Sequence, residues 1–230
     1  MIKRITFDQF TNKPYSLGFI FITAFFLRLI NVGAPVIGIH SWRQADTAAI
    51  ARNYLANHLI FWQPQVDWSG ATKGFVECEF PIYQYIVALL YKLFGFNEIV
   101  ARSFSILCSC LTLLLVFRIG RLLFDERVGW WGAWFYAILP IPVFYGRTIQ
   151  PEALMMLLGA FSLERWLVYL EDKKSLTLFF SWIGFTFAVL IKVLPFFWIG
   201  IPILVTAYKK NVLFKRLWWG CSGSTSRAIR

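Results

Sequence analysis

Long apolar runs separated by short basic clusters dominate this sequence and limit what it can fold into. The runs are 15 to 19 residues long, near the lower end of the range of about 17–25 residues that a helix needs to cross a bilayer. The runs cover residues 15–32, 99–117, 128–145, 152–170, 175–191 and 194–208. The sequence therefore predicts an all-α, polytopic membrane protein with about six spanning helices.

The charge balance agrees with this class and argues against nucleic-acid binding. Only 15% of the residues are charged and 58% are hydrophobic, whereas about a quarter of a soluble chain is charged. The net charge of +11 comes from small clusters between apolar runs. Membrane proteins carry such clusters in their cytoplasmic loops, and a nucleic-acid surface would need a basic stripe on a soluble scaffold. We therefore expect no nucleic-acid partner.

The run at residues 80–96 decides the topology. It is 17 residues long, which is at the lower limit for a spanning helix. If it crosses the bilayer, Arg118, Arg121 and Arg127 fall on the outer side. If it lies in the interface, these and the later basic clusters are cytoplasmic. The positive-inside rule favours the interfacial interpretation.

This choice sets the predicted domain organisation. The chain begins with a basic cytoplasmic lead (1–14) and a first span (15–32), followed by an outer loop with interfacial helices (33–98). About five further spans (99–208) come next. The chain ends in a basic cytoplasmic tail (209–230), whose sequence resembles a truncated end. Ser41 is the expected N-cap of an interfacial helix over 42–58. Arg28 is expected to snorkel to the interface, and Pro140 and Pro142 to kink the third span.

Ionisable side chains on the predicted outer side are the candidates for chemistry. They are Arg43, Asp46, Arg52, Glu77, Glu79, Arg147, Glu152 and Lys192. Cations that neutralise a phosphate and a carboxylate that handles a proton would suit a reaction on a lipid phosphate at the membrane surface.

Asp46 is the best single candidate for a catalytic acid–base group. It would take a proton from an incoming hydroxyl or amine. An ordinary first-turn acid, favoured by the helix dipole, explains Asp46 equally well. Arg43 lies three residues earlier on the same helical face, so it either pairs with Asp46 or contacts a ligand.

The other candidates also have structural alternatives. Glu77 and Glu79 lie in a loop that is either solvated or part of the site. Glu152 follows a proline at a helix start, where a role in the helix dipole is ordinary. Arg147 and Lys192 either snorkel to headgroups or bind a ligand phosphate.

Several stretches together carry a family resemblance. These are HSWRQADTAAIARN, PIYQYIVALLYKLFG, ARSFSILCSCLTLLLVFRIGRLLFDERVG, YGRTIQPEALMMLLGA and VLIKVLPFF, in this order. The chain resembles the N-terminal half of the GT-C superfamily of polytopic glycosyltransferases. Within it, the similarity is to the protein O-mannosyltransferase-like group (glycosyltransferase family 39), which includes the lipid A aminoarabinose transferases.

The resemblance implies roles for particular residues. The family's catalytic acid at the start of the surface helix corresponds to Asp46. A gapless match, however, places the usual Asp-Glu pair of the family on Arg43 and Gln44. The family glutamate before the second interfacial helix corresponds to Glu77 or Glu79.

Two further positions follow from the same resemblance. The acid after the third span corresponds to Glu152, and the lysine that holds the lipid phosphate corresponds to Lys192. Arg147 would assist Lys192 in stabilising the departing lipid phosphate.

The implied activity is sugar transfer at the outer face of the cell (inner or plasma) membrane. The donor would be a polyprenyl-phosphate sugar and the acceptor a lipid, glycan or protein. Some relatives use a divalent metal with such carboxylates, so the resemblance allows a metal without requiring one. Relatives continue through further spans, so the chain would be a truncated and inactive fragment if it holds only half a site. A transporter or flippase with charges along its path and a non-catalytic membrane partner are the alternatives.

Overall fold

The structure is a computed structural model that describes residues 16–36, 40–68, 70–76 and 79–209. All regular elements in these residues are helices, and one isolated β-bridge joins Gln65 to Phe75. The predicted all-α fold is confirmed.

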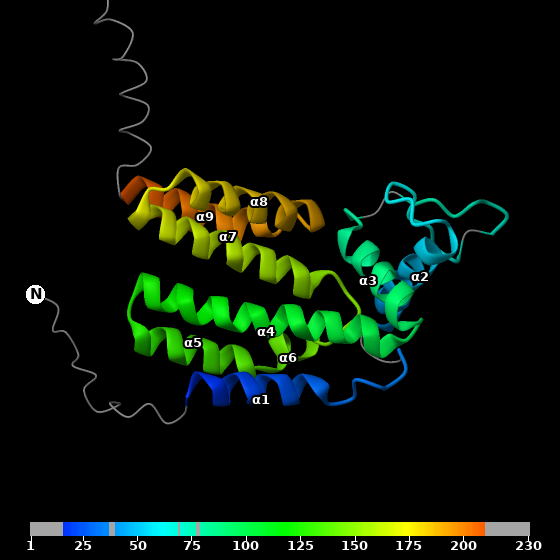
Figure 1. Ribbon diagram of the computed structural model, residues 1–230, viewed down its shortest axis with the longest axis horizontal. Coiled ribbons are helices and arrows are strands. Elements are labelled where there is room, and N and C mark those ends of the chain that lie inside the picture. Colours follow the sequence, from blue (N-terminus) through cyan, green and yellow to red (C-terminus); the bar gives the residue numbers. More distant parts are fainter. Residues whose placement is uncertain (1–15, 37–39, 69, 77–78, 210–230) are drawn as a thin grey trace, which may run out of the picture.

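Seven helices form an elongated bundle in which they run side by side (Figure 1). They are α1 (Leu17–Leu29), α4 (Glu98–Leu123), α5 (Glu126–Ile138), α6 (Pro140–Tyr145), α7 (Glu152–Asp172), α8 (Ser175–Ile191) and α9 (Pro195–Lys209). The long helices α4 and α7 occupy the middle of the bundle, with α5 and α1 on one side and α8 and α9 on the other.

A smaller body caps one end of the bundle. It contains α2 (Ser41–Ala56), α3 (Ile82–Phe94) and the loop between them. A buried core that includes Tyr54 of α2, Tyr83 of α3 and Leu154 of α7 joins this body to the bundle. The same core includes Ile149, in the turn before α7, so the turn and the cap are held together.

The bundle contains helices that suit a bilayer. Among the described residues, α4 and α7 are long and apolar enough to cross a membrane, and α1, α3, α8 and α9 are shorter apolar helices. Which of the shorter helices cross, and which side is cytoplasmic, stay predictions. The expected proline kink is a complete break, because α5 ends at Ile138 and α6 begins at Pro140, whose ring fixes a first-turn conformation.

The start of α2 differs from its expected cap. Ser41 is the first helical residue and not the N-cap. His40 occupies the cap position in the left-handed conformation, with φ of 57° and no side-chain hydrogen bond to the helix end. A non-glycine residue pays strain in that region, so the surrounding contacts, including one between His40 and Tyr145 described below, hold the turn.

Arg28 does not snorkel, which corrects the expectation from its place at the end of the first span. Its side chain is fully buried. The guanidinium donates to the carbonyl oxygens of Ala24 at 3.0 Å and Tyr136 at 3.1 Å, and to Ser109 Oγ at 2.8 Å. Tyr136 lies in the last turn of α5, where carbonyls lack intrahelical partners. Arg28 therefore supplies the donors that the broken α5–α6 connection needs.

Replacing Arg28 by methionine is expected to destabilise the bundle. The α5 carbonyls would lose their donors inside an apolar environment, at a cost of about 1–3 kcal/mol. Thermal unfolding of the detergent-solubilised protein would measure this. Arg127→Met, at an exposed arginine in the first turn of α5, is the matched control. Equal melting temperatures for the two variants would show that the buried guanidinium contributes no stability.

Candidate functional site

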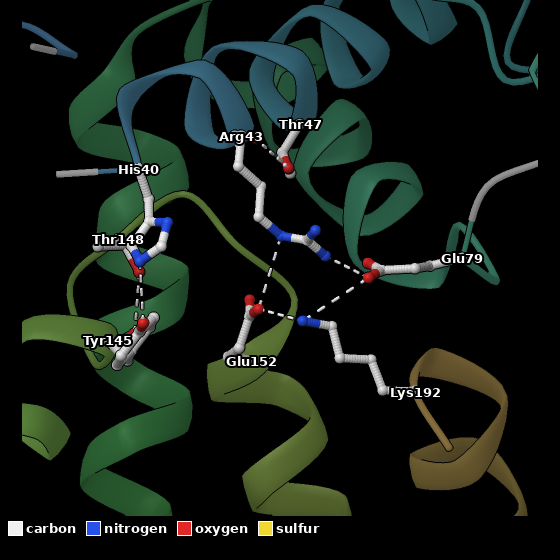
Figure 2. Close-up of polar contacts among 8 residues, drawn as sticks. All are labelled: His40, Arg43, Thr47, Glu79, Tyr145, Thr148, Glu152 and Lys192. Carbon is white, nitrogen blue, oxygen red and sulfur yellow. Dashed lines mark hydrogen bonds and ion pairs between the residues drawn. The ribbon is translucent and has the colours of Figure 1, made fainter. Parts of the chain in front are cut away.

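Four charged side chains meet where the cap joins the bundle, and we call them the ion cluster: Arg43, Glu79, Glu152 and Lys192. Figure 2 shows Lys192 between the two glutamates, with Arg43 reaching toward the same pair. Lys192 is ion-paired with Glu152 and lies 3.6 Å from Glu79 Oε1. Arg43 is ion-paired with Glu79, and its Nε lies 3.6 Å from Glu152 Oε1. Each cation thus faces both carboxylates.

Each member comes from a different part of the chain. Arg43 lies in the first turn of α2, and Glu79 precedes α3 by three residues. Glu152 is the first residue of α7. Lys192 is the C-cap of α8, directly before the turn into α9. Helix ends place side chains at the rim of a bundle, so the cluster forms at the end where the cap sits.

The cluster is partly withdrawn from solvent. The side chains of Glu152 and Lys192 are 17% and 20% exposed, so screening by water is weaker than for a surface ion pair. The second oxygen of Glu152, Oε2, is buried and accepts no hydrogen bond. A buried carboxylate oxygen without a donor is costly, and it is an open position for a polar group of a ligand.

The structure brings together four of the eight candidate residues predicted from the sequence. Arg147 lies apart, because its guanidinium donates to the carbonyl oxygen of Ile30 at the end of α1. Glu77 lies outside the described residues. Arg43 pairs with the two glutamates of the cluster and not with Asp46, and its contact with a ligand stays a prediction.

Asp46 is half-buried and lies one turn along α2 from Arg43, outside the ion cluster. Its Oδ1 accepts a hydrogen bond of 3.0 Å from the indole Nε1 of Trp68. The role of Asp46 as a catalytic acid stays a prediction.

Two polar groups next to the cluster were not predicted. His40 Nε2 lies 3.3 Å from the hydroxyl of Tyr145, and Figure 2 shows this pair beside Thr148 in the same view as the ion cluster. Gln150 is fully buried, and neither its amide nitrogen nor its oxygen has a hydrogen-bond partner. No spacing in the sequence marks these residues, because the strained turn at His40 and the buried turn at Gln150 exist only in the folded chain.

A second group of charges lies farther along α7. Glu164 is fully buried and pairs with Arg118 of α4 at 2.6 Å and with the adjacent Arg165. Twelve residues of helix, or about 18 Å, separate Glu164 from Glu152, so this group is not part of the ion cluster.

The described residues contain no group of three or more His, Cys, Asp or Glu side chains placed to hold a metal ion. The two carboxylates of the ion cluster each face Arg43 and Lys192. The arrangement suits an anionic ligand that Lys192 and Arg43 can neutralise, with carboxylates at hand for proton transfer.

A comparison with protein-family models gives one match. Residues 79–221 match the family described as dolichyl-phosphate-mannose-protein mannosyltransferase. The matched stretch is more than half of the chain and includes Glu79, Glu152 and Lys192, whereas Arg43 and Asp46 precede it. Neither the curated proteins nor the solved structures gave a match.

Exchanging the charges of one pair tests the cluster. Glu152→Lys and Lys192→Glu are each expected to lower thermal stability, because each leaves like charges close together. The double variant restores the pair, and we expect a coupling free energy of about 1–3 kcal/mol in the double-mutant cycle. Melting temperatures of the four proteins in detergent give the cycle. Additive effects of the two single changes would mean that Glu152 and Lys192 do not interact.

Proposed function

The chain belongs to the dolichyl-phosphate-mannose-protein mannosyltransferase family, a family of GT-C-type membrane glycosyltransferases, and on this premise we propose that it moves a sugar from a polyprenyl-phosphate donor to an acceptor at the outer face of the membrane. The ion cluster is the single observation that carries this proposal. It places two cations and two carboxylates at one end of an apolar bundle.

The cluster fits a lipid-linked phosphate for physical reasons. Lys192 and Arg43 can donate charge-assisted hydrogen bonds to phosphate oxygens. The apolar helices α8 and α9 meet at Lys192, so a polyprenyl tail can follow them into the bilayer while its phosphate stays at the cluster. This combination favours a phosphate on a lipid over a soluble nucleotide sugar.

The proposed reaction uses the charges of the ion cluster and the carboxylate of Asp46. The acceptor oxygen attacks the anomeric carbon of the donor sugar, and the bond between that carbon and the phosphate oxygen breaks. The new glycosidic bond uses the acceptor oxygen, whose proton passes to a carboxylate. The polyprenyl phosphate leaves with an added negative charge, which Lys192 and Arg43 stabilise. Asp46, one turn from Arg43, is the proposed proton acceptor.

The open oxygen of Glu152 gives a second carboxylate for this step. Its Oε2 is buried and unpartnered, whereas Asp46 is held by Trp68. The two acids are therefore tested side by side below.

Removal of either cation is expected to weaken binding of the lipid phosphate. We expect Lys192→Ala and Arg43→Ala to raise the Kd for undecaprenyl phosphate by about 10- to 100-fold, since each loses a charge-assisted hydrogen bond. Binding to the protein in nanodiscs, followed by native mass spectrometry, would measure this. Lys92→Ala, at an exposed lysine of α3, is the control. If neither Lys192→Ala nor Arg43→Ala changes this Kd, the lipid phosphate does not bind at the ion cluster.

Transfer assays distinguish the two candidate bases. If Asp46 is the base, Asp46→Asn lowers kcat by about 100-fold or more while undecaprenyl-phosphate binding stays unchanged. Glu152→Gln keeps the shape of the side chain and should then alter donor binding more than kcat. The measurement is sugar transfer from a polyprenyl-phosphate hexose in membranes that contain the chain. Wild-type turnover by Asp46→Asn together with loss of turnover by Glu152→Gln would assign the base to Glu152.

A further inference from the structure

Two exposed indoles flank Asp46 on the outer face of α2, and we call Trp42, Asp46 and Trp68 the indole platform. Trp42 and Asp46 are four residues apart on one helix, so their side chains are neighbours. Trp68 reaches Asp46 from the following loop through its indole nitrogen. Trp42 is 69% exposed and Trp68 is 64% exposed. Large exposed apolar surfaces gathered at one place mark sites that bind a ligand, a partner or a lipid surface.

The loop that carries Trp68 is fixed against α2. Asn53 donates to the carbonyl oxygen of Gln65 and to Asp67 Oδ1, both at 2.9 Å. Arg52 donates to Asp67 Oδ2 at 2.6 Å. The hydrogen bond from Asn53, and after it the one from Arg52, lowers the pKa of Asp67.

These contacts act on the preceding residue, so the indole of Trp68 is placed before any ligand arrives. A preorganised aromatic surface loses little conformational entropy on binding.

The chemistry of the platform matches a pyranose ring. Indole faces carry negative charge density and attract the partly positive C–H groups on the flat face of a sugar. A carboxylate accepts hydrogen bonds from hydroxyl groups. Trp68 occupies only Oδ1 of Asp46, and within the described part of the chain no residue donates to Oδ2. The platform thus offers stacking surfaces next to an open acceptor.

A lipid surface matches the same residues less well. Aromatic residues at membrane interfaces direct their polar edge to the headgroups, but the polar edge of Trp68 is directed to Asp46. The carboxylate of Asp46 would also face the negative potential of anionic headgroups. Its charge opposes insertion of this surface.

We propose that the indole platform binds a saccharide unit of the acceptor, so that the acceptor class is a glycan or a glycosylated lipid. This inference rests on the proposed function, because the ion cluster supplies the donor. Arg43 of the cluster directly follows Trp42 in the sequence and precedes Asp46 by one turn. A sugar stacked on the indoles therefore lies one helical turn from the donor phosphate, with a hydroxyl at Asp46.

Saturation-transfer NMR with methyl hexosides tests the platform on the whole chain in nanodiscs. We expect magnetic saturation to pass from the protein to at least one bound methyl glucoside, mannoside or galactoside. Trp42→Ala and Trp68→Ala should each weaken this binding by about fivefold or more, through loss of a stacking surface. Trp62→Ala is the matched control, because Trp62 is 77% exposed in the same loop and outside the platform. Unchanged melting temperatures would confirm that the variants fold.

Undecaprenyl-phosphate binding, measured on the same samples, separates this inference from the proposed function. Hexoside binding that is lost in the platform variants, while the lipid phosphate still binds, supports the platform. Binding of the lipid phosphate by a wild-type protein that binds no hexoside overturns the platform and leaves the proposed function standing. A wild-type protein that binds a hexoside but not the lipid phosphate would contradict the proposed function and leave the platform standing. Quenching of Trp42 and Trp68 by brominated lipids would also overturn the inference, by showing that the platform contacts the bilayer.

Discussion

The ion cluster is the interaction on which the arrangement of the cap and bundle depends. Its members come from α2, the lead into α3, the start of α7 and the end of α8. Hydrophobic packing joins α2 and α3 to α7, but it is not directional. Opposite charges at helix ends fix which ends meet. The ion pairs therefore give the cap one orientation on the bundle, and the candidate site is a product of that orientation.

Buried arginines complete the frame in a different way. Arg28 and Arg102 are both buried, and both donate to backbone carbonyls. Arg28 donates to the carbonyl oxygen of Tyr136 at the end of α5, and Arg102 donates to that of Val32 in the link after α1. Arg147 adds a third guanidinium at Ile30. A buried carbonyl without a donor is costly, so Arg28 and Arg102 act as fixed donors where the helices end.

The sequence predicted the helices well because apolar length and proline positions are local properties. The break at Pro140 and the turn at Lys192 follow from them directly. Charge type and position along a helix also identified Glu79, Glu152 and Lys192 as candidates.

The sequence could not show which partner each charge would take. Arg43 pairs across 36 residues with Glu79 and not with Asp46 one turn away, and Arg147 lies apart from the cluster. Such choices depend on how helices cross, which hydropathy does not encode. The strained turn at His40 is likewise a consequence of tertiary contacts.

The ion cluster contains as many cations as carboxylates, and this balance affects how a lipid-phosphate sugar donor would bind. Two positive and two negative side chains cancel, so the resting site presents little net field to an arriving phosphate. An anion that binds the ammonium of Lys192 would compete with Glu152 and Glu79 for its donors. Such competition would weaken the ion pairs that join the start of α7 and the residues before α3 to the end of α8. Substrate entry would then be coupled to a change in the contacts between the cap and the bundle.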